Sequence, residues 1–173
     1  MPGDLTLHFV YPEPTTTNDI RTVQMRQVVE GSADEVEMYK FHHPVTGSVS
    51  GVTTFHRMNF ATARWENAGQ IDWSSKFNAV IYFGVERVPI RELRKPKKSS
   101  SKSRRFKVSG TEYKWKLVDD SPDMTCVTTR GKSLATWTET AQTLWVSEKV
   151  DSILDRIVVT CFLNIWMKSI NAW

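Results

Sequence analysis

Seven basic side chains are concentrated in one twelve-residue segment of the chain, with no acidic residue among them. The whole chain carries 23 Lys and Arg against 19 Asp and Glu, and without this segment the balance is 16 against 19. The positive charge is therefore local rather than a property of the whole surface. The segment also contains four serines and one proline. The cations that we predict to bind an anionic partner are Arg94, Lys95, Lys97, Lys98, Lys102, Arg104 and Arg105.

Residues 94–105 have little apolar surface to bury, and we expect them to form a mobile loop. Such a loop could contact anionic phospholipid, serve as a nuclear import signal, contact nucleic acid, or act only as a solvated spacer. Each Lys or Arg near an anionic membrane contributes about 1 kcal/mol of attraction, so the segment suits a weak peripheral attachment. The loop has no aromatic side chain that could stack on bases, so we do not expect nucleic acid to be the partner.

The sequence contains no nucleophile with an evident base beside it. Cys126 and Cys161 lie in apolar runs, where the reactive thiolate is disfavoured. Asp119, Asp120 and Asp123 could act as paired carboxylates, but an acidic loop of this kind is typical of a solvated turn. We therefore predict that the protein is not an enzyme.

Three histidines could converge on a metal ion if their strands pair. His42 and His43 are neighbours in the sequence, and His56 follows in the next candidate strand. Adjacent residues of a strand point to opposite faces, so His42 and His43 cannot both ligate one metal without a local bend. We predict no metal site and no cofactor.

The C-terminal segment from Val150 to Ala172 has the pattern of a helix that is apolar on nearly every side. Ser147 is a suitable N-cap for it. A helix apolar all round is buried either in protein or in a membrane. The uncharged run from Ile157 to Met167 is only eleven residues, whereas a membrane-spanning helix needs about 20. We predict a buried core helix without stable transmembrane insertion, and a tail anchor is the alternative.

The rest of the chain predicts about eleven to thirteen short strands. Candidates include Asn59–Glu66 and Gln70–Trp73 as separate strands joined by a turn at Asn67-Ala68-Gly69, Val85–Leu93, and a hairpin from Arg105 to Val118. Many strands without interleaved helices indicate antiparallel sheets, and a large barrel needs something inside it. We predict a single mainly β domain over residues 1–173, a roughly twelve-stranded antiparallel β-barrel around helix 150–172. Its predicted core includes Trp73, Phe106, Tyr113, Trp115, Ile157, Val158, Cys161, Phe162, Ile165 and Trp166.

A family resemblance rests on three aromatic and glycine patterns, Gly69-x-Ile71-x-Trp73, Arg105-Phe106 followed by Gly110-x-x-Tyr113-x-Trp115, and Leu154-Asp155-x-Ile157-Val158-x-Thr160. With them the chain resembles an uncharacterised domain family of mushroom-forming (basidiomycete) fungi, similar to the tubby C-terminal and phospholipid-scramblase group. The resemblance implies a twelve-stranded β-barrel around a hydrophobic C-terminal helix. Tubby-like relatives bind phosphoinositides through basic surface residues, but no position matches one by one, so no site residue is carried over. A scramblase-type calcium loop of the D-x-[DN]-x-[DN]-G kind does not occur in this sequence.

The same features indicate where the protein works and what it does. No secretion signal is visible at the first residues, no Asn-x-Ser/Thr site occurs, and the two cysteines fit buried reduced thiols. We expect a cytoplasmic protein, either peripheral at membranes or nuclear. The leading hypothesis is a non-enzymatic intracellular binding module of the tubby-like kind that binds anionic phospholipid through the basic loop. The alternative is a soluble protein-interaction or structural domain whose loop is an import signal or spacer; the sequence does not identify a protein partner.

Overall fold

The computed structural model describes residues 3–13, 19–45 and 50–173 and is dominated by β-strands. Strands alternate buried and more exposed side chains, as in β1, because successive residues of a strand point to opposite faces. The elements in chain order are β1 (Leu5–Val10), β2 (Val23–Val28), β3 (Glu35–His42), β4 (Gly51–Asn59), β5 (Arg64–Trp73), β6 (Ala79–Phe83), β7 (Glu86–Pro89), α1 (Ile90–Leu93), β8 (Ser103–Val108), β9 (Thr111–Leu117), β10 (Met124–Thr128), β11 (Ser133–Thr138), β12 (Thr143–Val146), the 3-10 helix η1 (Glu148–Ile153) and α2 (Leu154–Ser169).

The twelve strands form one antiparallel sheet in the order β7-β6-β5-β4-β3-β2-β1-β12-β11-β10-β9-β8. The prediction of a mainly β fold with about twelve antiparallel strands and a C-terminal helix is confirmed. The predicted closure into a barrel is wrong, because β7 and β8 end the order and are edge strands of an open sheet. In the chain, α1 and a loop connect these two strands in place of a hairpin turn.

Two predicted strand boundaries are also corrected. Asn59–Glu66 and Gln70–Trp73 are not separate strands, because β5 runs unbroken through the predicted turn at Gly69. A Cβ atom at Gly69 would lie 2.0 Å from the backbone oxygen of Tyr82, so this glycine serves a close approach of two strands rather than a turn. The predicted strand Val85–Leu93 ends at Pro89, and its last four residues form α1.

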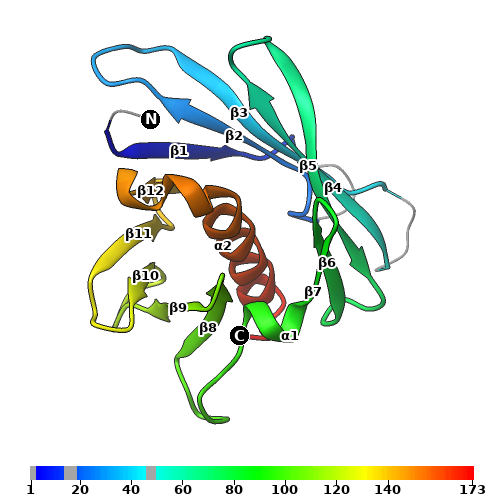
Figure 1. Cartoon of the computed structure of the whole chain (residues 1–173), viewed down its shortest axis with the longest axis vertical. Helices are drawn as coiled ribbons and strands as arrows, with labels where there is room; N and C mark the ends of the chain where they lie inside the picture. Colours follow the sequence, from blue (N-terminus) through cyan, green and yellow to red (C-terminus); the bar gives the residue numbers. More distant parts are fainter. Residues whose placement is uncertain (1–2, 14–18, 46–49) are drawn as a thin grey trace. The chain divides into compact units, whose positions relative to one another are not determined.

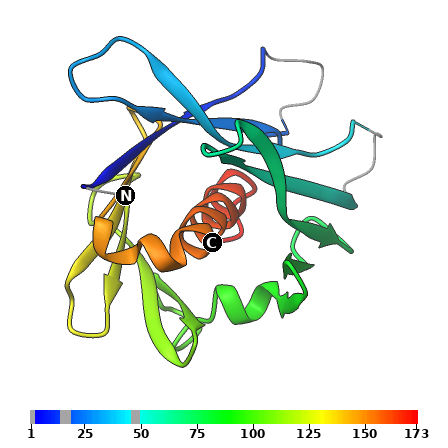
Figure 2. The same ribbon diagram turned by 45° about the horizontal axis from the view of Figure 1, so that its top comes forward.

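The chain folds into two compact units. The first comprises Met1–His8 and Arg91–Ile165, and the second comprises Phe9–Ile90 and Trp166–Trp173. In the first unit the N-terminal part of α2 lies against one face of strands β8 to β12 (Figure 1, Figure 2). The indole nitrogen of Trp115 on β9 donates a hydrogen bond of 2.8 Å to the hydroxyl of Thr160 on α2, and both side chains are fully buried.

The second unit contains a buried arginine. The Arg21 side chain is 1% exposed and binds the Asp19 carboxylate, with Nη2 2.7 Å from Oδ2. Its guanidinium also lies over two indole rings, 5.2 Å from the centroid of Trp73 and 4.4 Å from that of Trp166. The Trp166 indole donates to the Lys76 carbonyl at 2.8 Å. Ion pairing and cation–π contacts together compensate for taking this charge out of water.

The α-helix in the structure is shorter than the predicted helix 150–172. Ser147 caps η1, where its side chain accepts a hydrogen bond from the backbone nitrogen of Lys149, and α2 follows from Leu154 to Ser169. Nearly all of α2 between Ile157 and Met167 is buried. The predicted core residues are buried as well, except that Tyr113 is half-buried and stacks on Phe106. Among the described residues, the helices are all too short or too polar to cross a bilayer.

Candidate functional site

The basic loop is held to the strand that follows it by backbone hydrogen bonds. Lys95 and Arg105 exchange two such bonds, each of 2.9 Å, and the Ser101 nitrogen donates to the Lys98 carbonyl at 2.9 Å. The Ser101 hydroxyl accepts a further bond from the Ser103 nitrogen. Residues 103–105 belong to β8, so the predicted loop 94–105 is shortened to residues 94–102. These contacts fix where its lysines emerge.

Arg94 points into the first unit rather than to the surface. Its Nε donates to Oδ1 of Asn164 on α2 at 2.6 Å, across 70 residues of sequence, and Asn164 is completely buried. Burial, together with the charge of Arg104, lowers the pKa of Arg94 to about 10. The sequence predicted Arg94 as a surface contact, but the structure uses it to satisfy a polar side chain on an apolar helix.

Arg104 is the second cation that the structure withdraws from the surface. Its side chain is 7% exposed, and Nη1 donates to the carbonyls of Ser101 and Ser103 at 2.8 and 2.9 Å. Burial lowers the pKa of Arg104 below its usual value. This side chain therefore holds the loop in place, and we assign it a structural role.

Arg105 is only partly available. Its Nη1 lies 3.3 Å from the Glu112 carboxylate, and both side chains are about a third exposed. The four lysines of the loop are exposed: Lys95, Lys97, Lys98 and Lys102. Lys102 lies 3.7 Å from Asp119, but both side chains are so exposed that water screens this pair strongly. Of the seven predicted cations, the four lysines remain fully presented to a partner.

Strands β8 and β9 add cations that the sequence prediction missed. Side chains of directly opposed residues lie on the same face of a sheet. Arg105 pairs with Lys114, and Lys107 pairs with Glu112. Lys116 is opposite Ser103 and continues the same outward face. The signal was present in the sequence as the alternation of Glu112, Lys114 and Lys116 with apolar residues.

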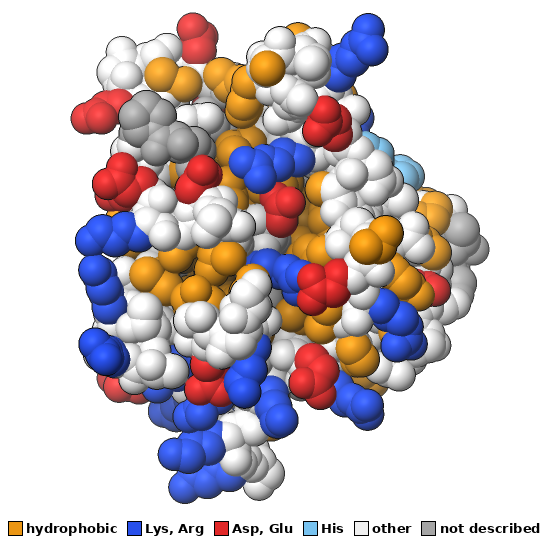
Figure 3. Space-filling view, viewed as in Figure 1, with side chains coloured by type: hydrophobic (Ala, Val, Ile, Leu, Met, Phe, Trp, Pro, Cys, Tyr) orange, Lys and Arg blue, Asp and Glu red, His pale blue; other side chains and the backbone are white. Residues whose placement is uncertain are grey.

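We call this set the basic surface. Figure 3 shows Lys and Arg side chains gathered at the bottom of the view, over the loop that joins α1 to β8. Beside it runs an open groove of about 640 Å³, whose lining includes Lys102, Lys116, Ser103 and Thr125 as well as Asp119. The basic surface comprises Lys95, Lys97, Lys98, Lys102, Arg105, Lys107, Lys114 and Lys116, and its acidic neighbours are Glu112 and Asp119.

The other residues considered from the sequence occupy different places. His43 is buried with Nδ1 2.8 Å from the Thr53 hydroxyl, whereas His42 is exposed. The described part of the chain has no group of three His, Cys, Asp or Glu side chains that could hold a metal ion. Both cysteines are buried and free, and burial raises the pKa of the Cys126 thiol well above its usual value.

Comparison with models of protein families matches residues 18–167 to one described as a "Family of unknown function (DUF6593)". Comparisons with curated proteins and with solved structures found no match.

Proposed function

The chain belongs to the DUF6593 family of unknown function, and we propose that it is a non-enzymatic binding module that attaches to anionic phospholipid through the basic surface. One observation carries the proposal. Eight cations share the loop and the outward face of β8 and β9, and two of them, Lys102 and Arg105, lie close to the carboxylates of Asp119 and Glu112. A surface of one sign attracts the opposite sign over a distance of about 10 Å at moderate salt.

The cations of β8 and β9 determine how strong this attraction to a membrane is. At about 1 kcal/mol for each Lys or Arg, the four loop lysines give about 4 kcal/mol, which corresponds to a dissociation constant near 1 mM. The whole basic surface carries a net of about six charges, and the same estimate gives tens of micromolar. We therefore propose that the loop and the strands act together in a reversible attachment.

The groove beside Lys102 and Lys116 supports the choice of phospholipid. Phosphate oxygens accept hydrogen bonds from ammonium and hydroxyl groups, and lysines, serines and a threonine line this groove beside one carboxylate, Asp119. One lipid headgroup at the membrane surface then occupies the groove, while the lysines of the loop contact neighbouring headgroups.

We also propose that the fold is of the tubby-like kind and that the protein is cytoplasmic with a peripheral membrane pool. Twelve antiparallel strands followed by a buried C-terminal helix support the first point, and the open sheet is a departure from the expected barrel. A fluorescent fusion that concentrates at the cell periphery, and loses this pattern when the loop lysines are replaced, would support the second.

The test is co-sedimentation of the purified protein with phosphatidylcholine vesicles, with and without anionic phospholipid, at low and physiological salt. One variant changes Lys95, Lys97, Lys98 and Lys102 to Ser, and a second changes Lys107, Lys114 and Lys116 to Thr. A control variant loses the same number of positive charges as the first variant, through Arg64, Lys76, Arg87 and Lys149 changed to Ser, all outside the basic surface. We expect salt-sensitive binding to anionic vesicles that both variants weaken and the control keeps.

Equal loss in the control would mean that only net charge matters, and the proposed site would be wrong. If the wild-type protein does not sediment with any vesicle, the phospholipid proposal fails as a whole. The alternative function, a protein-interaction or structural domain whose loop is an import signal or spacer, would then take its place. An import signal predicts that the four-lysine variant leaves the nucleus without any change in vesicle binding.

A further inference from the structure

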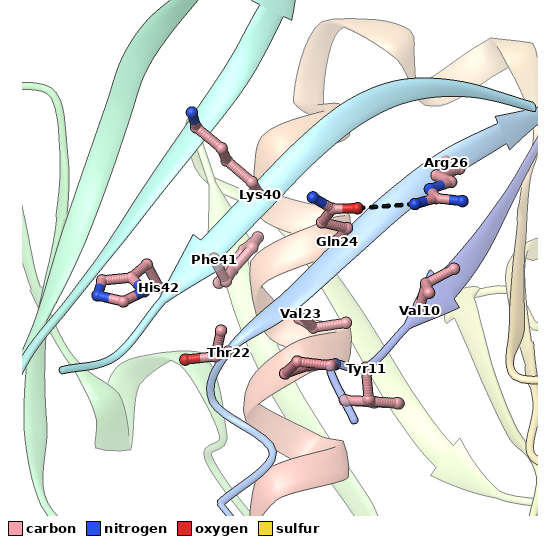
Figure 4. Close-up of a pocket in the computed structure, with 10 residues that line it drawn as sticks. Val10, Tyr11, Thr22, Val23, Gln24, Arg26, Lys40, Phe41 and His42 are labelled. Atoms are coloured by element: carbon pink, nitrogen blue, oxygen red, sulfur yellow. Dashed lines mark hydrogen bonds between the residues drawn. The ribbon is translucent and has the colours of Figure 1, made fainter. Parts of the chain in front are cut away.

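A second groove lies in the other compact unit, on the outward face of β2 and β3. It has a volume of about 370 Å³, at the lower end of the range of about 300 to 1,000 Å³ typical of small-molecule pockets. The end of β1 and the two residues that follow it supply an apolar wall with Val10, Tyr11 and Pro12. Figure 4 shows Gln24 and Arg26 side by side on β2, with Lys40 and His42 projecting from β3.

The polar side chains of this groove are cations and hydrogen-bond donors, and the residues that line it include no Asp or Glu. Glu37 is opposite Arg26 in the register of β2 and β3, but it is not among the residues that line the groove. Arg26 Nη2 donates to Gln24 Oε1 at 3.0 Å, so the amide oxygen is occupied and the amide nitrogen remains as a donor. Arg26 Nε is enclosed and has no hydrogen-bond partner among the described residues. The protein itself therefore uses the guanidinium only in part.

Sheet register and an aromatic ring hold the second cation in place. Gln24 on β2 pairs directly with Lys40 on β3, which brings both side chains to one face of the sheet. The Lys40 ammonium lies 4.5 Å from the ring centroid of Trp65. Lys40 also pairs with His56 on β4, and burial, and then the charge of Lys40, lowers the pKa of His56. A β-bulge between Met25 and Arg26 changes the register next to the groove, a feature frequently found beside binding sites.

We propose that this groove binds a small organic anion, a carboxylate or phosphate ester with an aromatic or short alkyl group. Arg26 donates to the oxyanion, Lys40 on the neighbouring strand adds positive charge to the same face, and Val10, Tyr11 and Pro12 contact the apolar group. A guanidinium forms charge-assisted hydrogen bonds with such oxygens, which are about twice as strong as neutral ones. The site shares no residue with the basic surface and does not depend on attachment to phospholipid.

The test is a titration of the ¹⁵N-labelled full chain followed by amide chemical shifts, with three probes. Benzoate and phenyl phosphate combine a ring with the two kinds of oxyanion, whereas benzyl alcohol has the ring without the charge. We expect both anions to cause saturable shifts at Gln24, Arg26 and Lys40, and benzyl alcohol to bind at least about tenfold more weakly. Whichever of the two anions binds more tightly identifies the oxyanion.

Two variants assign the binding to the groove. Arg26→Gln with Lys40→Gln should weaken the binding of the preferred anion at least about tenfold, because the charge-assisted contact of Arg26 and the neighbouring charge of Lys40 are both lost. Arg64→Gln with Arg87→Gln removes the same charge from exposed positions of the same unit and should bind as the wild type does. The spectrum of each variant reports whether its fold is retained.

Three results would overturn the proposal. Shifts that do not saturate, or that spread over all exposed lysines, would mean only weak association with surface charge. Equal affinity in the Arg26/Lys40 variant would place the binding elsewhere. Inorganic phosphate that binds as tightly as phenyl phosphate would show that the apolar wall makes no contribution, and the organic-anion assignment would be wrong.

Discussion

Replacing Thr160 by Val tests whether the hydrogen bond inside the first unit anchors the C-terminal helix. Val has the shape of Thr without the hydroxyl, so the substitution removes the acceptor of the Trp115 indole and leaves no cavity. The Thr160 hydroxyl also donates to the Arg156 carbonyl at 2.7 Å, a bond within the helix that the backbone can replace. The main effect is therefore a buried indole nitrogen without a partner.

An unsatisfied buried donor costs about 1 to 3 kcal/mol. Taking about 2 kcal/mol, and about 2 to 4 °C per kcal/mol for a chain of this length, we expect Thr160→Val to lower the melting temperature by about 4 to 8 °C. Thermal unfolding followed by circular dichroism measures the shift, and urea unfolding gives the free energy directly.

A double-mutant cycle with Trp115→Phe isolates this interaction from the loss of packing. In the Trp115→Phe background the indole donor is absent, so Thr160→Val should become nearly neutral, with a coupling energy of about 1 to 2 kcal/mol. Thr160→Ser keeps the hydroxyl acceptor, so its effect on the free energy of unfolding should be the same in both backgrounds. Equal destabilisation by Thr160→Val in both backgrounds would refute the reasoning, because the loss would then come from packing alone.

Three further predictions follow from single residues. Gly69→Ala should lower the free energy of unfolding in urea by at least about 3 kcal/mol, because its Cβ would lie 2.0 Å from the Tyr82 carbonyl oxygen. Gly84 has open space around it, so Gly84→Ala should cost only about 1 kcal/mol. Similar losses for the two variants would contradict the close approach at Gly69. Burial lowers the pKa of His43, so the folded chain binds protons less readily than the unfolded chain. Stability should be highest above about pH 6.5 and fall as the pH drops towards the folded pKa, and a His43→Gln variant that kept the full slope would exclude this cause. The third prediction rests on the proposed phospholipid attachment. Phosphorylation of the exposed Ser99 adds about −1.5 to −2 charges and should weaken vesicle binding about 30-fold at low salt. Unchanged sedimentation of the phosphorylated protein would contradict it.

Most local elements could be predicted from the sequence because their signals are local. The alternation from Arg105 to Val118 predicted the β8–β9 hairpin, and Ser147 was predicted as the cap at which the C-terminal helical segment begins. Gly69 misled the prediction for a physical reason. A glycine signals a turn and a close approach of strands equally well, and only the position of Tyr82 on the neighbouring strand distinguishes the two.

The candidate site was predicted in part. The loop lysines Lys97 and Lys98 are exposed as expected, whereas Arg94 is half-buried and bonded to Asn164, and Arg104 is buried. A run of cations looks uniform in sequence, because no local pattern distinguishes a side chain that faces water from one that faces the core. The partner of Arg94 lies on α2, and this distance along the chain explains why the pairing was not predicted.

The sequence by itself determined the class of fold and the need for a buried helix. The alternation of apolar residues along each strand and the apolar character of α2 are set by neighbouring residues in the sequence. The hydrophobic effect favours burial of these side chains whichever strands pair. Tertiary structure alone decided the open order of the sheet, the burial of Arg21 against two indole rings, and which cations meet solvent. These features depend on strand register and on contacts between segments that are distant in the sequence, and such contacts form only in the folded chain.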